Sequence, residues 1–431
     1  MAARRRARSI CRLADVLIRR AEADGVVRDL WRAGDDVELD AGGAAVIPGL
    51  HDHHIHILAL AAALVSVDVS SGLAPLRTAT GTGWIRAVGY PDDLDRWQID
   101  DVVADRPVRV QHRSGSLWIL NSRALDAIGI EHPDGRLFRA DEWLRERTPG
   151  PAIDVGAVGR LLLGRGVTGV TDATPTTSAD ALRLLATLPQ QVCAMTAPGV
   201  AGEAPVKLII GDHELPSPEG VARHIEQARP RPVAIHCATR VALLLALAAF
   251  DVVGAQRGDR IEHGAVMSLD EAVRVAEHGL VVVTQPSFVV ERRHLYEAEV
   301  EAYDRSDLWR CATLLAAGVR VAGSTDAPYG SFDPWRAIAA ASSRELGPHE
   351  RVTPRAALDL FLAPLATPGG HPRRVADADD LIILDRPLAD ALADPAAVQV
   401  VAAFRDGRVL HGPHPPAPRT GGRGTEAASP G

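Results

Sequence analysis

Two histidines stand two residues apart at the end of the first apolar, β-rich segment of the chain. His54 and His56 close the run Gly49-Leu50-His51-Asp52-His53-His54-Ile55-His56. Side chains two apart in a strand point to the same face, and neutral imidazoles on one face can chelate a divalent metal ion. The spacing therefore predicts that these two histidines share a ligand site.

Further polar side chains follow at the ends of later apolar segments. His236 ends the segment 233–236, His263 ends 260–263, and Asp326 follows 319–324. A single histidine is more often structural than a metal ligand, but four histidines and a carboxylate at equivalent strand ends reverse that expectation. We therefore predict that these five side chains converge on one centre.

Lys207 is the one lysine among 47 Lys and Arg residues, a bias typical of a GC-rich bacterial genome. Drift toward arginine would have removed any lysine whose role a guanidinium can fill. Lys207 lies within the apolar segment 206–210, which aims it at the same centre. A desolvated amine can lose its proton and take up carbon dioxide as a metal-bridging carbamate, whereas arginine stays protonated. The alternative is an ordinary strand-end lysine.

Eight apolar segments alternate with helical patterns and are expected to form parallel strands. They span residues 45–56, 108–111, 168–171, 206–210, 233–236, 260–263, 281–284 and 319–324. Amphipathic helices are expected at 178–188, 218–227, 269–278 and 309–317. This alternation predicts an α/β fold, and eight repeats favour a closed (β/α)₈ TIM-type barrel whose C-terminal strand ends carry the active site.

The length of 431 residues suits such a barrel, at residues 48–365, with a smaller module attached. Residues 1–47 and 366–411 are expected to supply the N- and C-terminal parts of a small β-sandwich. Residues 412–431 are rich in Pro, Gly, Ser and Thr and are expected to be a disordered tail, because they bury too little apolar surface to offset their ordering entropy.

Composition excludes several classes of partner. A formal charge of −8 argues against nucleic acid, and the longest apolar run, around 58–67, is too short to cross a membrane. The four cysteines form no C-x-x-C pair, which favours the cytoplasm over an oxidising compartment. We expect a cytoplasmic globular protein that acts on a small-molecule substrate, and the sequence leaves a homo-oligomer open.

The ordered motifs resemble those of the amidohydrolase superfamily. Residues 48–56 are similar to its P-G-x-x-D-x-H-x-H signature, and later motifs follow in order at 206–207, 236, 259–263, 323–328 and 380–385. Residues 107–125, with His112-Arg113-Ser114-Gly115 and Leu120-Asn121-Ser122, are similar to the amidohydrolase family 3 branch. That branch includes N-substituted formamide deformylase-like metal-dependent hydrolases. The resemblance covers about residues 40 to 410.

The resemblance implies a hydrolase that cleaves a non-peptide carbon–nitrogen bond in an amide, N-acyl or N-formyl compound. The metal ligands that it implies are His54, His56, Lys207, His236, His263 and Asp326. They would hold one or two divalent ions, zinc first, with a carbamate on Lys207 as the bridge. The first two histidines and Asp326 would bind the more buried ion, and the later two the more exposed one. Metal-bound hydroxide would attack the carbonyl while Asp326 serves as general base and then acid.

Substrate contacts are expected from the strand-end loops. The candidates are His112, Trp118, Asn121 and Gln285, with Phe288 and Trp335 also near strand ends. For the three large aromatic residues, core packing is an equal alternative. Asp52, Asp172 and Glu262 are expected to orient metal-bound imidazoles or to steady the loops.

Two departures from the family pattern bear on substrate recognition. Gly211-Asp212 follows the lysine strand where the branch often has Asp-Gly, and residues 236–240 replace the usual H-x-x-G-D.

One alternative function is that of a mononuclear deaminase of the same superfamily. Such relatives often carry a glutamate where this chain has Thr239. Another alternative is a non-catalytic binding protein on the same barrel. Such a protein should have lost some of the metal-ligating residues, whereas all six are present in this chain.

Overall fold

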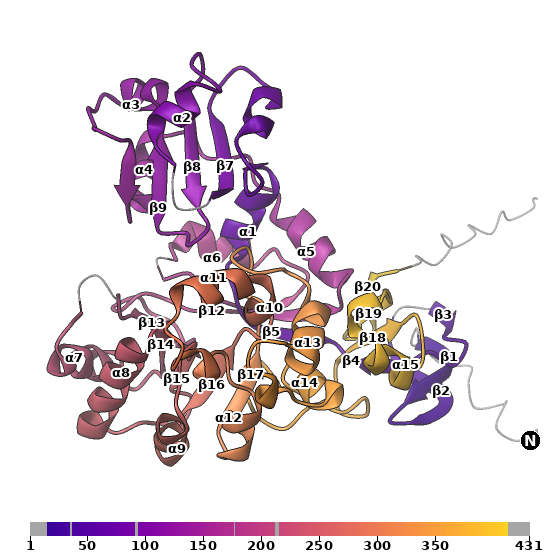
Figure 1. Ribbon diagram of the computed structural model, residues 1–431. Helices are drawn as coiled ribbons and strands as arrows, with labels where there is room; N and C mark the ends of the chain where they lie inside the picture. Colours follow the sequence, from indigo (N-terminus) through magenta and orange to yellow (C-terminus); the bar gives the residue numbers. More distant parts are fainter. Residues whose placement is uncertain (1–14, 35–36, 91–93, 176, 212–214, 413–431) are drawn as a thin grey trace, which may run out of the picture.

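The computed structural model describes residues 15–34, 37–90, 94–175, 177–211 and 215–412 (Figure 1). Two expectations therefore fall outside the described residues. They are the disordered tail, beyond residue 412, and the first 14 residues of the predicted sandwich. Asp212, one of the two departures from the family pattern, lies outside them as well.

Two parallel sheets carry the strand ends at which the predicted ligands lie. One has the strand order β12-β11-β5, and the other β13-β14-β15-β16-β17. The strands are β5 (Leu50–Ile55), β11 (Val167–Asp172), β12 (Gln191–Ala194), β13 (Val206–Ile209), β14 (Val233–Cys237), β15 (Arg260–His263), β16 (Val281–Thr284) and β17 (Arg320–Gly323). Strands β5, β11, β15 and β16 are buried along their whole length, as parallel strands covered on both faces should be.

The two sheets adjoin at both edges. Thr196, just after β12, forms a parallel bridge with Val206 of β13, and its carbonyl accepts a hydrogen bond from the Lys207 N–H at 2.9 Å. At the other edge the Asp326 N–H, just after β17, donates to the carbonyl of His54 at 2.8 Å. These contacts bring the carboxyl ends of the two sheets together.

Helices follow the strands and surround the parallel sheets (Figure 1). They include α5 (Val155–Leu163), α6 (Ala179–Leu185), α7 (Pro218–Ala228), α8 (Arg240–Val253), α9 (Leu269–Glu277), α12 (Ala312–Ala316), α13 (Pro334–Ser343) and α14 (Pro354–Asp359). Serine caps at Ser178, Ser217 and Ser268 start three of the four expected helices. Leu243 and Phe250 of α8 pack in one core with Ile235 of β14. Within the described ranges, no helix combines the length and apolar character that a membrane crossing requires.

The assignment of residues 108–111 as the second parallel strand was wrong. Strand β8 (Val108–His112) lies in a separate mixed sheet of order β10-β9-β8-β7-β6, while β5 pairs directly with β11. The additional parallel strand is β12, whose sequence Gln-Val-Cys-Ala carries no long apolar run. The periodicity of apolar residues does not show to which sheet a strand belongs. Strand β8 therefore takes the place of β12 among the eight parallel strands that the sequence predicts.

The mixed sheet and its helices form a lobe that stands beside the parallel sheets, at the top of Figure 1. We call residues 67–147 the inserted lobe. Its elements are β6 (Val67–Asp68), β7 (Ile85–Tyr90), α2 (Arg96–Asp100), β8, β9 (Leu117–Leu120), α3 (Ser122–Ile128), β10 (Arg136–Phe138) and α4 (Asp141–Arg147). Ile85, Ile99 and Val108 belong to a hydrophobic cluster of its own.

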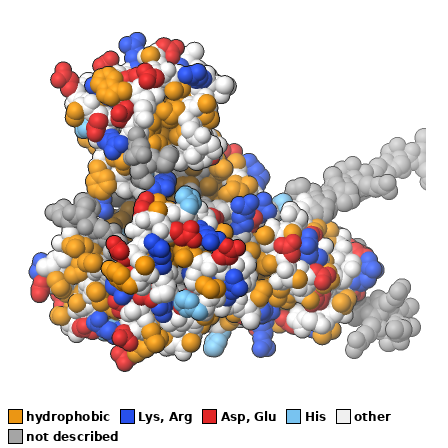
Figure 2. Space-filling view, viewed as in Figure 1, with side chains coloured by type: hydrophobic (Ala, Val, Ile, Leu, Met, Phe, Trp, Pro, Cys, Tyr) orange, Lys and Arg blue, Asp and Glu red, His pale blue; other side chains and the backbone are white. Residues whose placement is uncertain are grey.

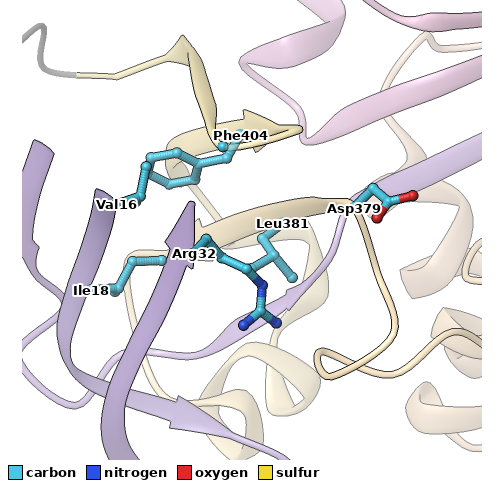
Figure 3. Close-up of a pocket in the computed structure, with 7 residues that line it drawn as sticks. Val16, Ile18, Arg32, Asp379, Leu381 and Phe404 are labelled. Atoms are coloured by element: carbon cyan, nitrogen blue, oxygen red, sulfur yellow. The ribbon is translucent and has the colours of Figure 1, made fainter. Parts of the chain in front are cut away.

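Segments from both ends of the chain meet in antiparallel pairs. Strand β18 (Asp380–Leu384) pairs with β4 (Val46–Pro48) and β19 (Val400–Arg405), which pairs with β20 (Arg408–His411). Strands β1 (Asp15–Ala23), β2 (Val26–Ala33) and β3 (Val37–Asp40) form a second sheet. Val16 and Ile18 of β1 share a hydrophobic cluster with Leu381 and Phe404 of the first sheet (Figure 3).

The face shown in Figure 2 intersperses basic and acidic side chains. A nucleic-acid-binding face would gather Lys and Arg into one patch or stripe. This face carries no such stripe among its described residues.

Candidate metal centre

His54, His56 and Asp326 form a compact group at the junction of β5 and the segment after β17. Their ligand atoms all lie within 4.8 Å of one another. Asp326 Oδ1 is 3.5 Å from His54 Nε2 and 3.3 Å from His56 Nε2. Asp326 also has a φ of +54°, a conformation that side-chain-bearing residues rarely adopt and that is concentrated at functional sites.

Hydrogen bonding determines which nitrogen of His54 is available. Its Nδ1 donates to a carboxylate oxygen of Glu262, which leaves Nε2 unprotonated and facing Asp326. Burial lowers the pKa of His54 well below its ordinary value, so the ring is neutral. Asp326 Oδ1 is itself buried without a hydrogen-bond partner among the described residues. Lone pairs that face one another in this way repel unless a cation lies between them, so these atoms fit a divalent ion.

Buried carboxylates hold this group in place. Glu262 pairs with Arg260, and both side chains are fully buried in β15. Asp52 accepts from the backbone N–H groups of His54 and Thr325, at 3.2 and 3.1 Å, which ties β5 to the segment after β17. Burial raises the pKa of Asp52 to about 7.

Asp172 steadies the loop that follows β5. It accepts from the N–H groups of Ile57, at 2.8 Å, and Thr174, at 3.1 Å. The contacts of Asp52, Asp172 and Glu262 are those of carboxylates that orient metal-binding imidazoles and fix the neighbouring loops.

His236 and His263 form a second pair at the ends of β14 and β15. Nε2 of His263 lies 2.9 Å from Nδ1 of His236. The His263 Nδ1–H donates to the side-chain oxygen of Gln285 at 2.8 Å and lies 4.0 Å from Asp326 Oδ2. Burial lowers the pKa of His236 to about 3 and that of His263 well below its ordinary value. Both rings are therefore neutral and able to act as ligands.

Lys207 is buried on β13, and its Nζ has no hydrogen-bond partner in the described part of the chain. Burial lowers the pKa of this amine, while the nearby carboxylates of Glu262 and Asp326 act in the opposite direction. An unsatisfied buried polar group costs about 1–3 kcal/mol. Such an atom fits a site whose coordination is completed by another group.

The structure places the four expected substrate contacts in different settings. Gln285 lies at the centre, but it accepts from His263 and donates to Ser324 Oγ at 2.8 Å. His112 is the last residue of β8, and its Nδ1 is 2.8 Å from Ser114 Oγ. Trp118 is buried in the inserted lobe and donates to Asp141 at 2.9 Å.

Asn121 is fully buried and serves as the cap of α3. Its side-chain oxygen accepts from the N–H groups of Val108 and Ala124, and its amide group donates to the carbonyls of Val103 and Arg106. No amide atom is left for a ligand, so its position gives no support to a substrate contact. A local Asn-Ser pattern before a helix fits a cap as well as a binding residue.

Phe288 and Trp335 are packed in hydrophobic clusters, with exposed fractions of 2% and 0%. Their burial matches the packing alternative.

Tyr329 is the neighbour of the centre that the sequence interpretation missed. Its ring meets that of His56 edge-on, with centroids 5.4 Å apart, and its N–H donates to the Asp326 carbonyl at 2.9 Å. The sequence could have indicated Tyr329, because it follows the predicted ligand Asp326 by only three residues.

Comparison with known proteins gives consistent relatives. A model of the amidohydrolase family matches residues 37–411. The N-substituted formamide deformylase of Arthrobacter pascens is 24% identical over an alignment of 487 residues, which covers 87% of this chain and 90% of that protein.

Solved structures share the fold. Uncharacterized metal-dependent hydrolases from Pyrococcus furiosus and Pyrococcus horikoshii OT3 align with TM-scores of 0.67 and 0.68, at 22% and 21% identity. The alignments cover 86% and 92% of this chain and 99% and 100% of theirs. The N-isopropylammelide isopropylaminohydrolase of Burkholderia multivorans aligns with a TM-score of 0.54 at 16% identity, over 92% of this chain and 98% of that one. With the family model matched over most of its length, the chain belongs to the amidohydrolase family and is a hydrolase of carbon–nitrogen bonds.

Proposed function

We propose that this enzyme hydrolyses a non-peptide amide bond, in an N-formyl or another N-acyl compound, with the help of one or two divalent metal ions. The observation that carries the proposal is the group of His54, His56 and Asp326, whose ligand atoms lie within 4.8 Å of one another. The similarity to an N-substituted formamide deformylase supports testing formamides first.

The proposed scaffold is a (β/α)₈ barrel at residues 48–365, interrupted by the inserted lobe. The bridge between Thr196 and Val206 and the hydrogen bond from Asp326 to His54 support closure of the two parallel sheets into one barrel. The terminal sheets, at residues 1–47 and 366–411, would form the small β-sandwich. Their shared hydrophobic cluster supports that assignment.

In this proposal the six ligands are His54, His56, Lys207, His236, His263 and Asp326. The first two histidines and Asp326 would hold the more buried ion, the later two would hold the more exposed one, and Lys207 would bridge them as a carbamate. Zinc is the first candidate because imidazole-rich sites suit it. When bound, such an ion lowers the pKa of water toward neutrality and polarises the substrate carbonyl.

The residues themselves position the reactants and move the proton. Asp326 lies between the two histidine groups, so its carboxylate can accept a proton from the attacking water and return it to the leaving nitrogen. Glu262 and Gln285 fix the tautomers of His54 and His263, because each accepts the Nδ1 proton.

The free cysteines Cys193 and Cys311 support a proposed cytoplasmic location, since reducing compartments keep thiols free. The deaminase alternative has no observation in its favour. Thr239, at the position of the expected glutamate, caps α8 by accepting from the Ala242 N–H at 3.2 Å.

The test is to purify the protein without chelators and to measure amine release from a panel of N-substituted formamides and N-acyl amines. Asp326→Asn should lower kcat by about 10²- to 10⁴-fold, as removal of a general acid–base does, while the folded secondary structure is retained. Amine release at the wild-type rate in this variant would overturn the proposed role of Asp326. Release of ammonia from an aminated ring, with one ion per chain, would favour the deaminase.

A further inference from the structure

The turn between β8 and β9 is a part of the inserted lobe that lies against Tyr329, the neighbour of His56. The N–H of Gly115 donates to the His112 carbonyl at 2.9 Å, and its own carbonyl accepts from the Gln111 side chain at 2.9 Å. The hydroxyl of Ser114 contacts His112 Nδ1 at 2.8 Å and the hydroxyl of Ser116 at 3.0 Å. These bonds make residues 112–116 a rigid turn.

The backbone of this turn lies against the ring of Tyr329. A Cβ placed on Gly115 would collide with that ring, at 2.7 Å from its hydroxyl oxygen. The same turn is joined to the end of α11 (Arg293–Glu299) by an ion pair of 3.7 Å between Arg113 and Glu299. Two independent contacts therefore hold the inserted lobe at this place.

The Tyr329 ring also meets the ring of His56, one of the candidate ligands. Its centroid lies 5.4 Å from that of His56, and its backbone is fixed by hydrogen bonds with the Asp326 carbonyl and the Arg292 side chain, at 2.9 and 2.7 Å. The ring also packs against the hydrophobic cluster around Phe288. Tyr329 is thus in contact with both the inserted lobe and a candidate ligand histidine.

We propose that Tyr329 is a specificity-determining residue and that the turn at 112–116 positions it, so that the inserted lobe sets the size of the acyl group accepted beside His56. The inference rests on the proposed function and adds a substrate class to it. Because the turn prevents the Tyr329 ring from moving toward the lobe, the space beside His56 admits a small acyl group such as formyl or acetyl. It excludes aromatic acyl groups.

The test uses Co²⁺-loaded protein and two metal-chelating probes, acetohydroxamate and benzohydroxamate, whose dissociation constants are read from the visible Co²⁺ absorption. Wild type should bind acetohydroxamate more tightly. Tyr329→Ala should shift the ratio of the two constants at least about tenfold toward benzohydroxamate. Gly115→Ala places a Cβ against the ring, which must shift beside His56, and should weaken both probes about tenfold, a coupling expected of groups in direct contact.

Two controls separate this effect from general disturbance. Gly129 has a φ of +71°, close to the +78° of Gly115, but a Cβ there meets nothing within 4 Å. Gly129→Ala should therefore carry the same backbone strain without weakening either probe. In Tyr329→Ala protein, adding Gly115→Ala should have no further effect.

The outcomes are distinct for the two proposals. If wild type binds no Co²⁺, the proposed function fails. If Co²⁺ and both probes bind but Tyr329→Ala leaves their ratio unchanged, only the present inference fails. It also fails if Gly115→Ala weakens the probes equally with and without Tyr329. Should Gly115→Ala not fold, the ratio measured in Tyr329→Ala still decides.

Discussion

Replacing Lys207 with methionine is expected to stabilise the metal-free protein while weakening its hold on metal. The Lys207 amine is buried, and no described residue hydrogen-bonds to it. Methionine keeps an unbranched chain without the amine, so the variant removes an unsatisfied polar group and opens little space. Removing one such group should raise the free energy of unfolding by about 1–3 kcal/mol.

The same substitution removes the proposed bridging ligand, so stability and metal binding should change in opposite directions. Urea denaturation of chelator-treated protein, followed by circular dichroism, measures the first quantity. Competition with a chromophoric chelator measures the second. Lys207→Arg is the matched comparison. Its guanidinium stays charged and would be buried near Arg260, which should destabilise the metal-free protein by about 3–5 kcal/mol.

Two results would refute this reasoning. A metal-free Lys207→Met protein that unfolds at lower urea than wild type would mean that the amine is satisfied and stabilising. Unchanged metal affinity in a folded Lys207→Met protein would mean that Lys207 takes no part in binding.

Three further predictions concern the groups around the centre. Glu262→Gln should lower metal affinity about 10- to 100-fold because it replaces the charged acceptor that orients His54 with a neutral amide; unchanged competition with a chelator would contradict this. In metal-free protein, the lowered pKa of His236, about 3, means that the unfolded chain binds more protons between about pH 6.5 and pH 3. Stability should therefore fall as the pH drops from 7.5 to 5.5, by up to about 1.4 kcal/mol per unit for this residue, and His236→Asn should flatten that dependence in urea titrations. Asn121→Ala should lower the thermal midpoint, since a cap alone contributes about 1 kcal/mol, yet leave metal content unchanged; loss of metal would argue for a role at the centre.

The grouping of His54, His56 and Asp326 could be predicted because it depends on local rules. Residues two apart in β5 share a face, and the ends of parallel strands meet at one edge. His54, His56 and Asp326 accordingly lie within one group, and His263 contacts both His236 and Gln285. Lys207 was found by a different signal, its uniqueness among the basic residues.

The path of the chain between β5 and β11 could not be predicted in the same way. Strand β8 has the apolar pattern of a parallel-sheet strand, but its partners β7 and β9 are decided by tertiary contacts that no local pattern encodes. Strand β12 is short and begins with an exposed glutamine. The structure gives Asn121 the role of a helix cap, which the sequence could not distinguish from a binding residue because both have the same local pattern.

The central claim is that these side chains bind divalent metal, and metal content per chain tests it most directly. Wild type, His56→Ala and His349→Ala would be purified without chelators and measured by mass spectrometry of the metals; His349 is 53% exposed and serves as the control. The account predicts one or two zinc-like ions in wild type and His349→Ala and a clear loss in His56→Ala. Absence of metal from wild type after reconstitution, or equal content in all three proteins, would contradict it.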